Sequence, residues 1–311
     1  MLILRVLAPT FLLIAFGAML RRSGFVSAEF LREGNRVVYW FGLPALLFNE
    51  LAAASLSVGG PAKMMFGAML AATAGVIALS YAGARLLRLP APATGTFVQG
   101  AFRGNLAFVG LPVIYSLPSG LTVNGAPVRT VAVMVIAPML VIYNVAGIVV
   151  LLASQIDVRK LSPRYLLQQF LTTPPLLATV AGLAYAATGW AWPEVLHDTF
   201  DALAQLALPL ALLGIGGALV STPFGREWHA PLAAALLKTA VGPVLGWLCA
   251  RWLGLGPLDT KLVMLLLATP TAVISYTKVV ELEGSPALAS GSIVFSTLLS
   301  IAALAVIVAA L

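Results

Sequence analysis

Long apolar segments separated by short polar loops run along the whole chain. Ten of them approach the roughly 20 apolar residues that a helix needs to cross a bilayer. They span residues 2–20, 37–55, 64–84, 94–117, 130–153, 173–190, 195–219, 230–250, 260–280 and 286–310. Helices are the natural spanning element because they satisfy their own backbone hydrogen bonds in lipid. The pattern predicts an all-α polytopic membrane protein with ten transmembrane helices.

Two of these spans carry residues that a continuous membrane helix normally avoids near its middle. The interruptions are Arg103, Gly104 and Asn105 in the fourth span and Thr269, Pro270 and Thr271 in the ninth. Such breaks are tolerated at membrane depth only where the freed backbone lines a cavity or is buried in protein. Two interrupted helices at corresponding places in the two halves of a chain indicate the substrate site of a transporter.

The two halves of the chain repeat at an offset of 165 residues. The matched positions are Pro9 with Pro174, Leu12 with Leu177, Gly17 with Gly182, Gly24 with Gly189, Leu43-Pro44 with Leu208-Pro209, and Gly104-Asn105 with Thr269-Pro270. With five spans per half, the two halves must have opposite orientations. The repeat therefore predicts two inverted five-helix repeats, an architecture of many secondary transporters.

The breaks have a chemical consequence. A half-helix N-terminus leaves backbone N–H groups unpaired and carries partial positive charge. Gly104 lets the chain open, so that the N–H groups after it can point at a carboxylate. Pro270 removes a donor and frees the carbonyl of Leu266. A kinked helix without a ligand is the alternative, but paired breaks at repeat-related positions favour anion binding.

Composition and charge agree with a membrane protein and orient it. Of the 311 residues, 60% are hydrophobic and 9% charged, whereas soluble domains carry about 25% charged residues. Eleven lysines and arginines follow odd-numbered spans: Arg21, Arg22, Arg32, Arg36, Arg85, Arg88, Arg159, Lys160, Arg164, Arg226 and Lys278. Five lie on the opposite side: Arg5, Lys63, Arg129, Arg251 and Lys261.

This bias places both termini outside and the central loop in the cytoplasm, with the protein in the cell membrane. The net charge of +7 is thus explained by topology, and no nucleic-acid partner is expected. The segment 2–20 has its arginine pair behind it, the reverse of a signal peptide, so it is interpreted as a retained helix.

Three charged residues within the spans are candidates for function. Arg103 either pairs with an anionic substrate or bonds freed carbonyls as a structural ion. Lys238 is a possible coupling residue, although snorkelling on its long stem favours a structural role. Glu50, beside Asn49 near the outer end of the second span, is a candidate for proton coupling or a solvated group.

Other classes of function find less support. An intramembrane enzyme would need a nucleophile with a base, or an acidic metal motif, at membrane depth. The sequence has no HExxH or aspartate-rich run. Its two histidines, His197 and His229, lie in loops without ligands at metal-binding spacing. We therefore expect no enzyme activity, no metal and no cofactor.

The chain resembles the auxin efflux carrier family, which includes plant PIN auxin exporters and bacterial malonate-type carriers, over essentially all ten spans. The matching motifs are Asn105–Pro112, similar to the family's Asn-x-x-x-x-Gly-x-Pro, then Ala268–Pro270, and Leu43-Pro44 with Phe48-Asn49. Gly104 stands where the PIN fourth helix has proline, and the long central loop of plant members is missing. These departures favour a microbial organic-anion carrier.

The resemblance implies an elevator that moves a small carboxylate. Its dimerising scaffold would comprise residues 1–60 and 173–222, its transport domain residues 61–153 and 223–311, and its cytoplasmic linker residues 154–172. The broken fourth and ninth helices would cross beside the substrate. The substrate-binding candidates are Arg103, Gly104, Asn105, Tyr143, Asn144, Thr269, Pro270, Thr271 and Asn49. For Tyr143 and Asn144, hydrogen bonding between helices is the alternative.

A sodium-coupled symporter of the bile-acid type is the main alternative function. It predicts that uptake collapses when choline replaces sodium. The sequence has no clear cluster of acidic and amide residues around the breaks, although backbone carbonyls can also bind sodium. For the enzyme alternative, the expected result is product formation without net movement across the bilayer.

Overall fold

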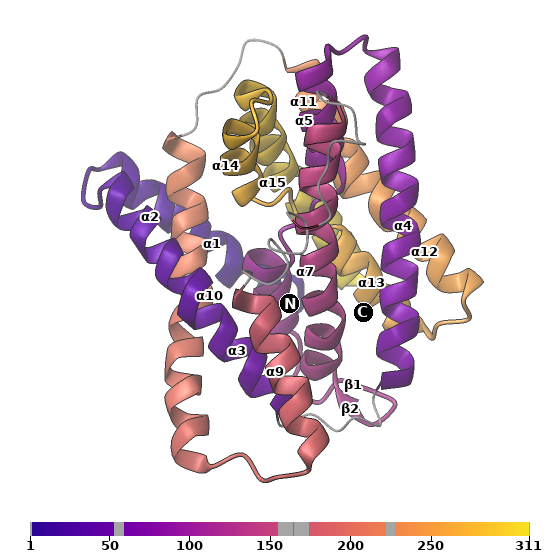
Figure 1. Ribbon diagram of the computed structural model, residues 1–311. Coiled ribbons are helices and arrows are strands. Elements are labelled where there is room, and N and C mark those ends of the chain that lie inside the picture. The colour runs from indigo at the N-terminus through magenta and orange to yellow at the C-terminus, as the bar shows by residue number, and fades with distance from the viewer. Residues whose placement is uncertain (1, 53–58, 155–163, 165–173, 222–227, 311) are drawn as a thin grey trace.

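The computed structural model describes residues 2–52, 59–154, 164, 174–221 and 228–310, and these are mainly helical (Figure 1). π-Helical turns are labelled η. The first half contains α1 (Leu2–Arg22), α2 (Ala28–Val37), η1 (Val38–Gly42), α3 (Leu43–Ala52), α4 (Gly59–Leu86), α5 (Ala91–Phe102), η3 (Leu106–Gly110), α6 (Leu111–Tyr115), β1 (Thr122–Val123), β2 (Ala126–Pro127) and α7 (Val128–Ala153). The second half contains α9 (Pro174–Thr188), α10 (Glu194–Ser221), α11 (His229–Leu236), η5 (Leu237–Val241), α12 (Gly242–Trp252), α13 (Pro257–Leu267), α14 (Ile274–Glu281) and α15 (Pro286–Ala309).

Several helices are suited to a bilayer. Within the described ranges, five helical segments are long and apolar enough to cross one: Gly60–Leu86, Val128–Ala153, Glu194–Gly217, His229–Trp252 and Pro286–Ala309. The predicted spans 94–117 and 260–280 are each divided into two shorter helices. The molecule is therefore a polytopic membrane protein in which two of the predicted spans are interrupted.

The two interruptions meet in space. Gly104 and Thr271 form an isolated antiparallel bridge. The Asn105 N–H donates to the Pro270 carbonyl at 2.8 Å, and the Ala272 N–H donates to the Arg103 carbonyl at 2.9 Å. The prediction of a break in each segment is confirmed, and the bridge shows that the broken segments cross.

The helices fall into two packed groups. α1 packs against α10, and α3 packs against α9 and α10. α12 packs against α4 and α13, and α11 packs against α15 and α5. In Figure 1 the first group, with α2, forms the left side of the molecule, while α4 and α12 form the right. The bridge between the broken helices belongs to the second group.

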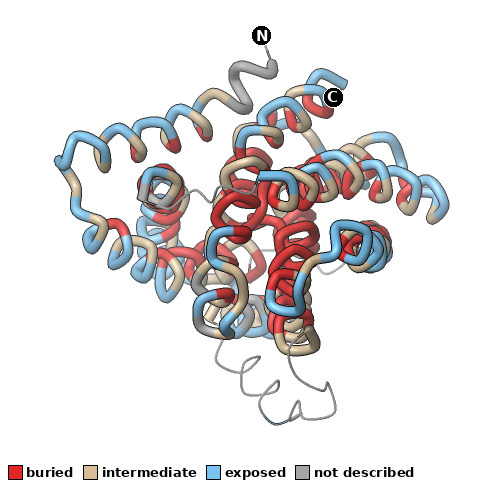
Figure 2. The backbone as a smooth tube through the Cα atoms, turned by 90° about the horizontal axis from the view of Figure 1, so that it is seen from above, coloured by how far each residue is buried: buried red, intermediate tan, exposed pale blue. Residues whose placement is uncertain are grey.

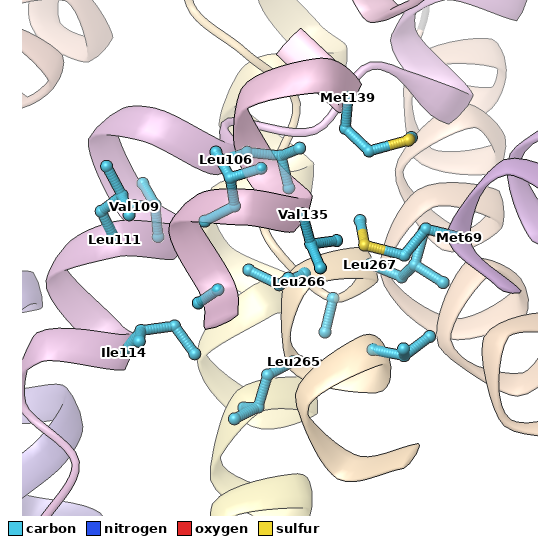
Figure 3. Packing of buried hydrophobic residues seen from close by; sticks show 14 of the residues in the cluster. Met69, Leu106, Val109, Leu111, Ile114, Val135, Met139, Leu265, Leu266 and Leu267 are labelled. Carbon is cyan, nitrogen blue, oxygen red and sulfur yellow. The ribbon is translucent and has the colours of Figure 1, made fainter. Parts of the chain in front are cut away.

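Burial is concentrated on the central helices, and the outer faces are exposed (Figure 2). Figure 3 shows Leu106 of η3 close to Val135 of α7 and Leu266 of α13, with Val109 beside Leu111. Lipid tails are as apolar as these side chains, so close packing, rather than removal from water, stabilises such a core within a membrane. The breaks are thus enclosed in a densely packed interior.

Two local features differ from the sequence-based expectation. β1 and β2 form a small hairpin around Asn124-Gly125, both with positive φ. Asn-Gly is the preferred pair for such a two-residue turn, but the sequence pattern predicts only helices and loops. The second span is predicted at 37–55, whereas helix begins at Ala28, where the Ser27 side chain caps α2.

Candidate functional site

The first break is shaped by Gly104 and Asn105. A Cβ atom on Gly104 would lie 2.7 Å from Thr269 Oγ1 and 3.1 Å from Lys238 Cε, so only glycine fits this crossing. Asn105 caps η3, because its Oδ1 accepts from the Phe108 N–H at 3.2 Å. The polar pair that interrupts the sequence pattern therefore ends one helix and begins the next.

The second break is held by side chains that take up its freed carbonyls. Thr269 Oγ1 donates at 2.7 Å to the carbonyl of Leu266, the group that Pro270 deprives of its helical donor. The ammonium group of Lys238 donates to the carbonyl of Leu267. Because of these contacts, the carbonyls of Leu266 and Leu267 each have a hydrogen-bond partner within the protein.

Thr271 links the crossing to two neighbouring helices. Its Oγ1 donates to the carbonyl of Gly100 on α5 at 2.7 Å, and its N–H donates to Ser296 Oγ on α15 at 2.9 Å. Thr269 and Thr271 are both almost fully buried. Through these hydrogen bonds, the two threonines stabilise the shape of the crossing.

A cavity of about 60 Å³ lies beside the first break, which is room for roughly five water-sized groups. It is lined by Tyr39, Leu43, Arg103, Gly104, Asn105, Leu106, Ala107, Phe108, Leu140, Tyr143, Asn144, Pro175, Ala272, Val273 and Ile274. Its walls come from both packed groups of helices, since η1, α3 and α9 face the crossing and α7. The cavity therefore lies where the two groups meet.

Arg103 brings a positive charge into this cavity. Its side chain is only 3% exposed, and its Nη2 donates to Asn144 Oδ1. Its Nη1 is buried and has no hydrogen-bond partner among the described residues. Nor does any acidic side chain in the described ranges form a salt bridge with it. An unpaired charge of this kind is energetically expensive in a buried site.

Asn105 supplies a second donor. Because its Oδ1 accepts from a backbone N–H, its Nδ2 must be the free end of the amide, and this atom is buried without a partner among the described residues. Leu106 and Ala107, the first residues of η3, also line the cavity, and the first N–H groups of a helix have no partner within it. The cavity is thus lined by two hydrogen-bond donors, Arg103 Nη1 and Asn105 Nδ2, that have no acceptor among the described residues.

The chain's relationship to known proteins agrees with this geometry. A family model described as a membrane transport protein matches residues 2–308. The chain belongs to the auxin efflux carrier family. No curated protein matches it. Membership of the auxin efflux carrier family identifies it as a membrane transport protein, and its apolar helices make it a multi-pass one.

Not all residues predicted for the site of this carrier meet at the cavity. Arg103, Gly104, Asn105, Tyr143 and Asn144 line it, whereas Thr269, Pro270, Thr271, Asn49, Glu50 and Lys238 do not. The Tyr143 hydroxyl lies 3.4 Å from Thr73 Oγ1, within hydrogen-bonding distance, and the ring of Tyr143 packs edge-on against Phe102. Tyr143 therefore ties the cavity wall to α4.

Asn49 and Glu50 have partners elsewhere. Asn49 Oδ1 accepts from Trp192 Nε1 at 2.8 Å, within a cluster of aromatic rings on α3, α9 and α10. Glu50 Oε1 accepts from the Tyr115 hydroxyl at 2.5 Å, so it joins α3 to the end of α6. The structure places both residues in contacts between helices.

Sequence reasoning missed most of the apolar wall and one polar neighbour of this carrier's cavity. Tyr39, Leu43, Phe108, Leu140, Pro175 and Ile274 line the cavity, yet in the sequence they resemble lipid-facing residues. Gln99 is fully buried, and both of its amide atoms lack partners in the described ranges. Its polar amide inside an apolar span was the signal that could have identified it.

Gly147 on α7 gives Gln99 and Arg103 the room they occupy. A Cβ on Gly147 would lie 2.8 Å from Gln99 Nε2 and 3.4 Å from Arg103 Nη1. We expect Gly147→Ala to displace both groups and raise the KM for substrate by about 5- to 150-fold, the equivalent of an overpacking cost of about 1–3 kcal/mol. Uptake kinetics in proteoliposomes measure this effect.

Gly83→Ala is the matched control. Gly83 lies on α4, and its Cβ would meet Phe97 of α5, the helix that carries Gln99, at an ordinary 3.5 Å. Its KM should equal that of the parent protein. Equal KM values for the two variants would mean that the niche at Gly147 does not position Arg103.

Proposed function

We propose that this member of the auxin efflux carrier family is a secondary transporter that moves a small organic carboxylate across the cell membrane by an elevator movement. The observation that carries the proposal is a pair of buried donors at one cavity beside the crossing, Arg103 Nη1 and Asn105 Nδ2, for which the described residues supply no partner. Because one of them is charged, an anion fits this site better than a neutral ligand.

The number and kind of donors favour a carboxylate. A carboxylate has two acceptor oxygens and forms strong, charge-assisted hydrogen bonds with a guanidinium group. The start of η3 adds the partial positive charge of a helix N-terminus. A volume of about 60 Å³ suits a small acid. These features together support the substrate class.

The inverted repeat is part of the proposal, and several contacts support it. Gly17 approaches the backbone of Leu213, and Gly182 approaches the backbone of Phe48. Gly17 and Gly182 are 165 positions apart, and so are Phe48 and Leu213, as a two-fold relation between the halves requires. Gly24 and Gly189, the matched residues after α1 and α9, both have left-handed backbones, with φ of 75° and 68°.

The elevator movement assigns different roles to the two packed groups. We take residues 1–60 and 173–222 as the scaffold and residues 61–153 and 223–311 as the transport domain, joined by the linker 154–172. Apart from Ser154 and Arg164, the linker lies outside the described residues. The closest helix packing lies within each of these groups, and the cavity lies between them. A homodimer through the scaffold and a topology with both termini outside complete the proposal.

Asn105→Asp tests the binding role separately from the capping role. Aspartate keeps the oxygen that caps η3 but replaces the donor Nδ2 with a second acceptor. We expect saturable uptake of labelled malonate or another small acid into proteoliposomes to fall at least about tenfold, because a lost hydrogen bond to a charged group is worth about 1.5–3 kcal/mol.

The unfolding temperature without substrate is measured alongside uptake, to show that the variant folds and that the cap is retained. Unchanged uptake by Asn105→Asp would remove Asn105 from the site. If the parent protein transports no acid from a panel of small carboxylates, the proposed function is wrong.

A further inference from the structure

Lys238 is a buried basic residue at the crossing, and it does not line the cavity. Its side chain is 2% exposed, and it lies in η5, a π-helical turn within the otherwise α-helical segment His229–Trp252. Single π-turns inside α-helices occur frequently at functional sites. No acidic residue in the described ranges forms a salt bridge with Lys238. Its charge must therefore be balanced in another way.

The balance comes from the end of a half-helix. The ammonium group donates to the carbonyl of Leu267, the last residue of α13. The C-terminal end of a helix carries partial negative charge and unpaired carbonyls, and lysine stabilises it. Lys238 also reaches the other broken segment, because a Cβ on Gly104 would lie 3.2 Å from Nζ. The ammonium group is thus in the centre of the crossing.

In transporters with discontinuous helices, the C-terminal ends of half-helices and the unwound carbonyls beside them coordinate the coupling cation. We propose that the ammonium group of Lys238 occupies this position permanently, so that the carrier moves its carboxylate without sodium. The inference rests on the proposed function and specifies its coupling.

Three other carbonyls at the crossing support the same conclusion. Those of Leu266, Pro270 and Arg103 each accept a hydrogen bond from within the protein. Sodium requires several oxygens that converge on one point, and these three carbonyls already accept a hydrogen bond from a hydroxyl or an N–H group. A bound sodium ion would also be repelled by Lys238.

The test compares the parent protein with Lys238→Ala in sodium and in choline buffers. For the parent, uptake should be the same in both. For Lys238→Ala, uptake in choline should fall at least about tenfold, because a charge-assisted hydrogen bond is lost at the crossing. Methylammonium or sodium, which can enter the space that the side chain leaves, should restore it at least in part.

A second measurement requires no substrate. The unfolding temperature of detergent-solubilised Lys238→Ala should rise with methylammonium or sodium and stay constant with choline, since only a ligand that binds the folded state stabilises it. Lys261→Ala is the matched control. Lys261 also donates to the carbonyl at a helix end, that of Ala310, but does so at the protein surface. Its variant should show neither effect.

Three results would overturn the inference: sodium dependence of the parent, full activity of Lys238→Ala in choline, or an inactive, folded Lys238→Ala that no cation restores. If Lys238→Ala does not fold in any buffer, Lys238→Arg replaces it, and uptake that requires sodium in that variant counts against the inference. A parent that transports no carboxylate contradicts the proposed function alone, because the cation-dependent unfolding temperature is measured without substrate.

Discussion

Arg103→Met is expected to abolish most carboxylate transport while leaving the protein at least as stable as the parent. Removing one member of a buried charge pair costs about 2–5 kcal/mol, so the affinity for substrate should fall at least about thirtyfold. Without substrate, Arg103 is a buried charge with no salt bridge in the described ranges. Methionine removes that unfavourable charge and keeps the aliphatic part of the side chain, although the hydrogen bond to Asn144 is lost.

This combination of lower affinity and undiminished stability distinguishes a substrate-binding arginine from a structural one. Uptake kinetics and the unfolding temperature in detergent measure the two quantities. Arg129→Met is the control, because Arg129 Nη2 donates to the carbonyl of Tyr115 at 2.9 Å outside the cavity lining. It should keep the parent's KM. A destabilised Arg103→Met with unchanged KM would show that Arg103 serves the fold.

Gly17→Ala should cause the largest loss of stability among the variants considered. A Cβ on Gly17 would lie 2.2 Å from the carbonyl oxygen and 2.6 Å from the Cα of Leu213. Both are backbone atoms, so no side chain can move aside and α1 must separate from α10. We expect the free energy of unfolding to fall by at least about 3 kcal/mol, the upper part of the usual overpacking range.

Gly67→Ala is the matched control on α4, since its Cβ would meet only a side-chain atom of Leu253, at 3.9 Å. Alanine is the better helix former, so this variant should be unchanged or stabilised by about 0.5–1 kcal/mol. The unfolding temperature and the yield of monodisperse protein in detergent give the comparison. Equal stability of the two variants would contradict the close packing of α1 on α10.

Local chemistry made the breaks predictable. Arg103, Gly104 and Asn105 interrupt an apolar run, and Pro270 cannot continue a helix, so the ends of α5 and α13 follow from the chain itself. The offset of 165 residues also relates the two breaks to each other, because it pairs Gly104-Asn105 with Thr269-Pro270. The Gly104–Thr271 bridge at the crossing agrees with that pairing.

The direction in which each polar side chain points was less predictable from the sequence. Thr269 and Thr271 are as polar as Asn105, yet they bond to Leu266 and Gly100 instead of lining the cavity. Asn49 bonds to Trp192, which is 143 residues away in sequence. Each outcome depends on which helix packs against which, and that information is spread over distant parts of the chain.

The sequence by itself determined the membrane-protein class, the family and the places where the two helices break, because hydrophobic runs, prolines and glycines act locally. Only the tertiary structure decided that Arg103 Nη1 and Asn105 Nδ2, among other polar groups, have no partner in the described part of the chain, and that Lys238 reaches Leu267. The physical reason is that lipid-facing and buried surfaces are equally apolar in a membrane, so the pattern cannot tell which face of a helix turns inward.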